Sequence, residues 1–178
     1  MTACHEIYAT EPVRSLADGA PEFTPQHGAM YSHWGINALV VLVTAFTVAG
    51  AVVLHYEGLR WIANRLLKLP SLRHRKVLFG VYAIILLHVG EIWLFGAAYW
   101  SLMHAPGAGS IGGVVAPGFL DAVYLSAVTF STVGFGDLAP VGALRFLAGT
   151  EALTGFILIT WSASFLFLEM QEFWRRRT

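Results

Sequence analysis

The run Thr-Val-Gly-Phe-Gly at 132–136 offers main-chain oxygens at a spacing that suits a small cation. Gly134 and Gly136 lack a Cβ, so both can adopt positive φ angles, and a backbone that alternates in hand turns successive carbonyls to one side. Where several copies of the chain meet at an axis, stacked carbonyl rings can replace the hydration shell of a monovalent cation. The ligands in each copy would be the carbonyls of Thr132, Val133, Gly134 and Phe135, with the Thr132 hydroxyl at the inner end.

A short helix is expected to position this run. The apolar segment 119–132 is too short to cross a bilayer, and segments of this size are often re-entrant. Asp121 lies where the helix would begin, and its carboxylate can accept the free N–H groups there. We predict a re-entrant helix over 120–131 that enters from outside and points its negative C-terminal end at the bilayer centre. The irregular run that follows is tolerated at that depth only if protein covers it or it lines a watery cavity.

The composition indicates a membrane protein. Hydrophobic residues make up 56% of the 178 residues and charged residues 12%, about half of the usual charged share of roughly 25%. A soluble surface of this size would need more polar cover. The formal net charge of +0 gives no footprint for a nucleic-acid partner, and the single cysteine excludes a disulfide framework within the chain.

Three apolar segments are long enough to cross the bilayer, for which about 20 residues are needed. They are 34–56, 77–103 and 142–169, the last two interrupted by Glu91 and Glu151. Together with the re-entrant helix and its loop, they predict an all-α membrane protein with three transmembrane helices.

Basic residues predict the orientation of these spans. They gather in the linker 57–76 and in the tail 171–178, which the positive-inside rule places in the cytoplasm. The N-terminal tail 1–33 has several acidic residues and is expected outside, as a flexible extracellular or periplasmic segment. Within the linker, apolar residues at helical spacing over 59–69 predict a short helix on the inner leaflet. The basic residues are Arg60, Arg65, Lys68, Arg73, Arg75, Lys76, Arg175, Arg176 and Arg177.

From Asp121 to Asp137 the sequence resembles, in unbroken register, the pore loop of tetrameric potassium channels. The resemblance includes the pore helix, the T-V-G-[YF]-G filter and the acidic residue after it. With the flanking outer and inner helices it extends over 77–170, so the span 34–56 is an addition to this pore domain. It implies a passive potassium-selective channel rather than an enzyme, with potassium ions bound at the filter oxygens and no other cofactor.

The resemblance also implies partners and a location. One chain supplies a quarter of the filter, so function requires a homotetramer surrounded by membrane lipids. No span carries arginine at every third position, so no voltage sensor is expected. A regulatory subunit that controls gating remains a possible partner. The compact sequence indicates the plasma (inner) membrane of a prokaryote. A non-selective monovalent cation channel remains an alternative, because the filter sequence alone does not secure selectivity.

Several positions depart from the common pattern or stand at places of interest within it. Phe135 replaces the commoner tyrosine and so lacks a hydroxyl that would brace the filter. Tyr124 stands where many members carry tryptophan, so either Asp137 bonds Tyr124 to support the filter or that brace is missing. Gly155 falls where many members have a hinge glycine in the inner helix. A face of the third span that could line the inner cavity contains Phe156, Ile159, Ala163 and Phe167.

Ionisable residues inside the spans are functional candidates. His88 and Glu91 are three residues apart and share a helix face, so with Glu151 they are expected to form one buried cluster between two helices. Its role is open between a structural tie, a proton sensor for gating and a metal site, and the last would allow a membrane-embedded metalloenzyme. Other histidines are expected to be solvated or, beside Cys4, to form a weak metal pair: His33, His55, His104 and His5.

Overall fold

The computed structural model describes the chain over residues 34–68 and 73–175, with side chains described from 76 to 171 in the second stretch. The N-terminal tail, with Cys4, His5 and His33, lies outside these residues, as does the end of the basic C-terminal tail. Expectations for those segments therefore stay predictions.

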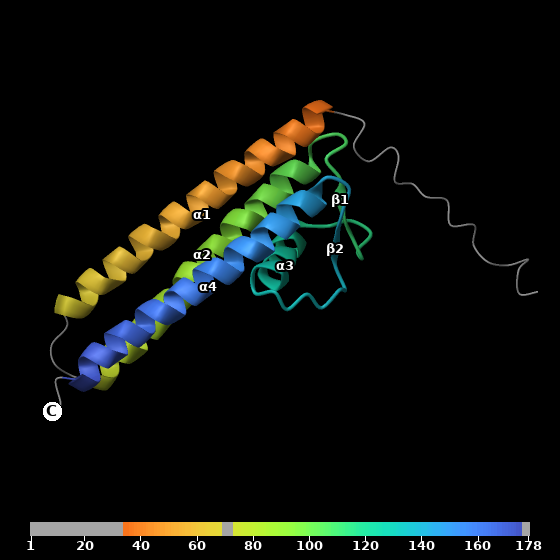
Figure 1. The fold of residues 1–178 in the computed structure, drawn as a ribbon. Helices are drawn as coiled ribbons and strands as arrows, with labels where there is room; N and C mark the ends of the chain where they lie inside the picture. The colour runs from red at the N-terminus through yellow and green to blue at the C-terminus, as the bar shows by residue number, and fades with distance from the viewer. Residues whose placement is uncertain (1–33, 69–72, 176–178) are drawn as a thin grey trace, which may run out of the picture.

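Three long helices form the body of the molecule (Figure 1). They are α1 (Trp34–Lys68), α2 (Arg73–Met103) and α4 (Leu144–Arg175). A shorter helix, α3 (Phe119–Phe130), lies beside α2 and α4, on the side away from α1. In the described chain, these three long helices are also the ones that are long and apolar enough to cross a membrane. The expectation of three apolar membrane helices is confirmed.

The first helix is longer than the sequence predicted. We expected a span over 34–56 and a separate helix on the inner leaflet over 59–69, but α1 runs without a break to Lys68. Leu59, Ile62 and Leu66 are buried against α2 and α4 instead of facing lipid headgroups. The reason is that they continue, at helical spacing, one buried stripe that starts far upstream. Its members are Val40, Thr44, Thr47, Ala51, His55, Leu59, Ile62 and Leu66.

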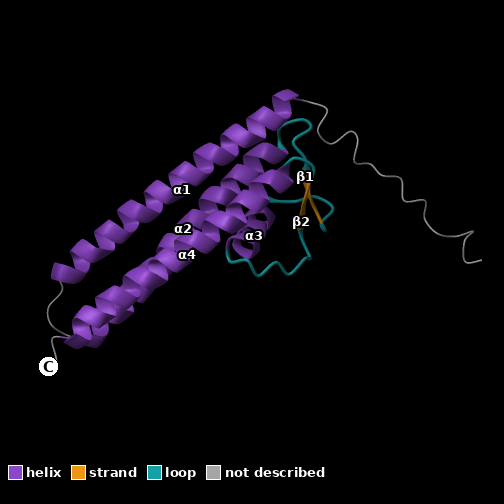
Figure 2. Cartoon of the chain, in the orientation of Figure 1, coloured by secondary structure: helices purple, strands orange, loops and turns teal. Residues whose placement is uncertain are grey.

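Two short strands bracket α3 in the chain. Strand β1 (Ser110–Gly112) precedes α3, strand β2 (Ala139–Val141) follows it, and they pair antiparallel with Ile111 opposite Pro140 (Figure 2). The sequence predicted only a Gly- and Pro-rich loop before α3, because the strands are three residues long and carry no alternating pattern. Their pairing closes a loop that contains α3 and residues 131–138.

The helix α3 begins with a capping interaction. The Asp121 carboxylate accepts a 2.7 Å hydrogen bond from the main-chain N–H of Gly118, just before the first helical residue, Phe119. The carboxylate also lies in the first turn, where its negative charge interacts favourably with the positive end of the helix dipole. This agrees with the expected role of Asp121 at the helix start.

The core lies where α2, α3 and α4 meet. Phe130, the last residue of α3, is 1% exposed, and its ring lies 6.3 Å from that of Phe95 on α2. Large side chains from all three helices pack around it. The end of α3 is therefore held from both sides. The buried side chains include Phe95, Tyr99, Leu125, Phe130, Leu144, Leu147 and Leu158.

Gly155 allows α4 to approach the end of α3. A Cβ at this position would collide with the main chain of Phe130, which cannot move away without shifting α3. Gly149, six residues earlier on the same helix, has nothing within 4 Å of the place a Cβ would occupy. The tight contact thus belongs to Gly155 and sets the distance between α4 and the residues that follow α3.

We expect Gly155→Ala to destabilise the protein and Gly149→Ala to leave it unchanged or more stable. Overpacking at a rigid contact costs about 1–3 kcal/mol, whereas alanine in place of an unhindered helical glycine gains up to about 1 kcal/mol. Thermal unfolding of both variants in the same detergent measures the difference. Equal melting temperatures would show that α4 and α3 are not in rigid contact here.

Candidate functional site

The segment from Thr132 to Gly136 has an alternating backbone. The φ angles are 59° at Thr132, 53° at Gly134 and 81° at Gly136, while Val133 and Phe135 between them are not in the positive region. The sequence predicted positive φ at the two glycines; the structure adds Thr132. A β-branched residue there is a genuine outlier, and such strain of about 1–3 kcal/mol persists at sites where surrounding structure enforces it.

Two main-chain hydrogen bonds hold the start of this segment against α3. The Thr132 N–H donates to the Thr129 carbonyl over 2.9 Å, and the Gly134 N–H donates to the Val128 carbonyl over 3.0 Å. Together they fold the chain back on the C-terminal turn of the helix. The carbonyls at that end carry the negative pole of the helix dipole, which favours a nearby cation.

The segment is open on its far side. Val133 is 55% exposed and Phe135 is 72% exposed, and nothing lies within 4 Å of the Cβ positions of Gly134 or Gly136. Exposed apolar side chains are costly in water, and irregular backbone with unpaired groups is costly in lipid. The described chain by itself leaves this surface without cover.

A hydrogen bond braces the end of the segment. The Tyr124 hydroxyl on α3 donates to Asp137 Oδ2 over 2.8 Å, which is the first of the two alternatives that the sequence left open. The hydrogen bond to the carboxylate raises the pKa of Tyr124 above its ordinary value. The phenol therefore keeps its proton and donates at neutral pH.

Glu151 is the centre of a buried network that joins α2, α3 and α4. Its side chain is 0% exposed, accepts a hydrogen bond from the Tyr99 hydroxyl over 2.6 Å and lies 2.5 Å from the Ser126 hydroxyl. Ser126 also reaches the Ile92 carbonyl at 2.9 Å, so its single proton is shared between two oxygens. The network fixes the middle of α3 to both long helices.

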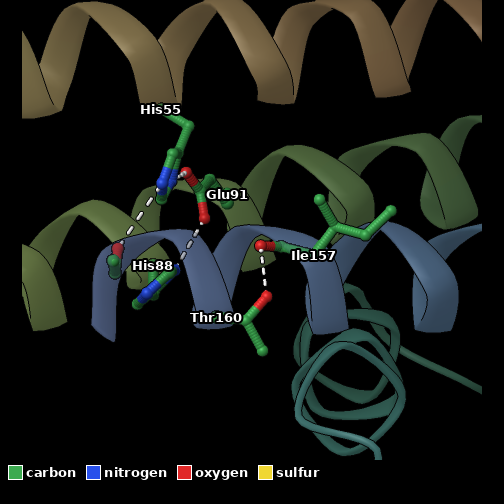
Figure 3. A network of polar contacts seen from close by, with 6 residues as sticks. His55, His88, Glu91, Ile157 and Thr160 are labelled. Atoms are coloured by element: carbon green, nitrogen blue, oxygen red, sulfur yellow. Dashed lines mark hydrogen bonds and ion pairs between the residues drawn. The ribbon is translucent and has the colours of Figure 1, made fainter. Parts of the chain in front are cut away.

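Glu91 belongs to a different network. His55 Nδ1 lies 2.7 Å from Glu91 Oε1, and His88 Nδ1 lies 2.8 Å from Glu91 Oε2, so each imidazole contacts its own carboxylate oxygen (Figure 3). The expected cluster of His88, Glu91 and Glu151 is therefore wrong in its third member. Glu151 is held by Tyr99 and Ser126, and the third group beside Glu91 is His55 from α1.

The expectation that His55 is solvated is also wrong, since it is 0% exposed. A lone histidine toward the end of an apolar span resembles an interfacial residue. The signal that could have found it is its place in the buried stripe of α1, at helical spacing between Ala51 and Leu59. His104, in contrast, is exposed just after the end of α2, where its Nδ1 contacts the Trp100 carbonyl at 2.7 Å.

Comparison with known proteins identifies the family. The family model described as ion channel matches residues 77–172, which is more than half of the chain. The chain belongs to the ion channel family. This channel is 35% identical over 82 residues to Protein LctB of Geobacillus stearothermophilus, covering 46% of the chain and 61% of that protein. It is 47% identical over 38 residues to Protein LctB of Bacillus caldotenax, covering 21% of the chain and 28% of that protein.

The channel thus spans less than two thirds of the length of either curated relative. No solved structure matches it. The matched family region contains α3 and most of α2 and α4, together with the Thr132–Gly136 segment. Helix α1, which contributes His55, lies before it.

The face of α4 that was expected to line a cavity is open in the single chain of this channel. Phe156 is 59% exposed and Ile159 37%, and Ala163 is also exposed. The opposite face of α4, with Glu151, Thr154, Leu158 and Ser162, is buried against the rest of the chain. One face of α4 therefore packs within the chain and the other is left for lipid, water or another copy.

We expect Ser126→Ala to loosen α3 in this channel. The change removes the hydroxyl that links Glu151 and the Ile92 carbonyl, and leaving a buried polar group without its partner costs about 1–3 kcal/mol. Thermal unfolding in detergent should show a lower melting temperature. Ser131→Ala is the matched control, because the Ser131 hydroxyl is exposed and bonds only the Ala127 carbonyl one turn back. If both variants melt alike, the Glu151 network does not hold α3.

Proposed function

We propose that this protein is the pore subunit of a potassium-selective channel and works as a homotetramer. Residues 132–136 of four copies would form the selectivity filter, and α3 would be a re-entrant pore helix. The main support for this proposal is the alternating backbone. The φ angle is positive at Thr132, Gly134 and Gly136, and it is not positive at Val133 and Phe135 between them. An alternating backbone turns successive carbonyls to one side, which is what a file of cation sites requires.

Dehydration is the chemical task of such a filter. A potassium ion must give up its hydration shell to pass, and without replacement ligands a charge near the bilayer centre costs at least a few kcal/mol. The carbonyls of Thr132, Val133, Gly134 and Phe135, with the Thr132 hydroxyl, would supply those ligands. No covalent step is involved, and the ion gradient drives the flow.

The rest of the chain would hold the filter in place. The C-terminal end of α3 directs its negative dipole end toward the filter. The two main-chain bonds from Thr132 and Gly134 to α3 would fix the inner end, and the Tyr124–Asp137 bond would fix the outer end. Gly155 would serve as both the close contact with Phe130 and the gating hinge, while Phe156, Ile159 and Ala163 would line the inner cavity.

The uncovered surface supports assembly of several copies. Val133, Phe135 and the open face of α4 expose large apolar side chains next to the irregular segment. Main-chain groups at membrane depth need protein cover or a water-filled passage, and neighbouring copies around an axis provide both. Contacts between two different surfaces of neighbouring copies generate a closed ring when the rotation closes, and such cyclic homo-oligomers are common.

Charge distribution supports the orientation in a prokaryotic plasma membrane. Arg60, Arg65 and Lys68 lie near the end of α1, and Lys76 lies near the start of α2. The end of α4 lies at the same end of the molecule, opposite the β1–β2 ladder (Figure 1). The positive-inside rule assigns this basic end to the cytoplasm and the filter-side loops to the outside.

We expect purified protein in planar bilayers to pass a current that reverses near the potassium equilibrium potential. A tenfold potassium gradient balanced by sodium should give a reversal potential of about 59 mV in magnitude, the value for a single monovalent charge. A reversal potential near zero under these conditions would favour a non-selective monovalent cation channel. The native mass of the detergent complex should correspond to four chains.

We also expect Gly134→Ala to abolish potassium current while the protein still assembles. Alanine resists the φ of 53° at this position, so the carbonyls on either side would turn away from the axis. Gly107→Ala is the matched control, because Gly107 also has a positive φ, 87°, but lies in the loop before α3. Equal loss of current in both variants would remove the argument that the filter backbone is responsible.

A further inference from the structure

The buried group formed by His55, His88 and Glu91 has no role in the conduction mechanism, yet it has the chemistry of a metal site. The donor atoms, one from each residue, all lie within 4.8 Å of one another. His55 and Glu91 are 0% exposed, and His88 is 17% exposed at its side chain. Two imidazole nitrogens and a carboxylate oxygen are a common donor set for zinc, with water as the fourth ligand.

We propose that His55, His88 and Glu91 bind a divalent transition-metal ion of the Zn²⁺ class, and that this ion joins α1 to the channel domain. The site is independent of the potassium proposal, because it contains no residue of the 132–136 segment. Its ligands come from two helices: α1 contributes His55, and α2 contributes His88 and Glu91. Hard cations such as Mg²⁺ and Ca²⁺ prefer all-oxygen sites, so the two imidazoles favour the zinc class.

The donor atoms are close enough to gather around one ion after a local rearrangement of the side chains. Zinc–nitrogen and zinc–oxygen bonds of about 2.0–2.2 Å place tetrahedral ligands roughly 3.3 Å apart. The two imidazole–carboxylate distances are 2.7 Å and 2.8 Å and run to different oxygens of Glu91, so each pair would separate by about half an ångström on metal binding. The metal would take the place of the proton between each pair, and each ring would then carry its proton on Nε2. Figure 3 shows His55 on α1 turned toward Glu91, with His88 on the other side of the carboxylate.

Charge and hydrogen bonding also favour a cation here. The Glu91 carboxyl group is fully buried, and buried charges in proteins are paired or bind metal. The Nε2 atom of His88 is buried and has no hydrogen-bond partner among the described residues. The other nitrogen of His55 lies 3.4 Å from the Ser162 hydroxyl on α4, which orients the ring as groups around zinc ligands do.

The position of the site lets a bound metal ion influence α3 and α4. The His88 ring lies 5.7 Å from the ring of Phe130, the residue at the end of α3, and the His55 ring lies 5.3 Å from Trp161 on α4. A metal ion that pulls the two imidazoles together would therefore act on α3 and α4 as well as on α1. Its occupancy would bias how the first helix is attached to the conducting domain.

The test is metal binding by the full-length protein in detergent. After removal of metal with a chelator, dialysis against Zn²⁺ should leave one more tightly bound zinc per chain in the wild type than in Glu91→Gln or His55→Ala. Each of these variants should bind zinc at this site at least tenfold more weakly. His104→Ala is the matched control, since this exposed histidine lies just after the end of α2 and outside the cluster, and it should bind as the wild type does.

The visible absorption of bound Co²⁺ reports metal coordination directly, and it would not appear if the three residues had only a structural role. Co²⁺ added to the wild type should give the intense visible absorption of a four-coordinate site, and His55→Cys should keep binding and add a thiolate-to-cobalt charge-transfer band. This variant also keeps the test decisive if His55→Ala or Glu91→Gln fails to fold. Absence of tightly bound zinc in the wild type, or binding unchanged in Glu91→Gln, would overturn the proposal. Neither result depends on whether the channel selects potassium.

Discussion

A short stretch of non-helical backbone sets the requirements that the rest of this structure meets. In an apolar environment, main-chain N–H and C=O groups that lack partners cost several kcal/mol each. The chain answers part of this requirement itself, through the hydrogen bonds that Thr132 and Gly134 make to the last turn of α3. The β1–β2 ladder then closes the loop on the other side. The remaining groups, with Val133 and Phe135, are left for ions, water or other copies of the chain.

Two buried carboxylates hold the helices around this stretch, and each does so with different partners. Glu151 ties α4 to α2 and α3 through Tyr99 and Ser126, close to the helix that supports the segment. Glu91 ties α2 to α1 through His55. Both are 0% exposed, and a buried polar group that loses its hydrogen-bond partner costs about 1–3 kcal/mol. The polar groups inside the spans are therefore structural first, and any gating or metal function is built on that frame.

Elements governed by local sequence were predicted well. The three apolar helices follow from length and hydrophobicity, and α3 follows from a short apolar run that begins near Asp121. The positive φ at Gly134 and Gly136 follows from residue type, whereas that at Thr132 does not, because its side chain disfavours the conformation. The full length of α1 could have been read from its continuous buried stripe, but the basic residues between the apolar positions resembled a surface helix.

The sequence by itself determined that this is a helical membrane protein with a half-length helix and a glycine-containing turn, because hydrophobicity, helix length and the freedom of glycine are local properties. Only the tertiary structure decided which buried groups meet. His88 and Glu91 share a face of one helix, so their contact could be predicted, but the third partner depends on how α1 packs. Helix packing placed His55 beside Glu91 and left Glu151 with Tyr99 and Ser126. Those contacts join residues 25 to 52 positions apart, and spacing along one helix says nothing about such distances.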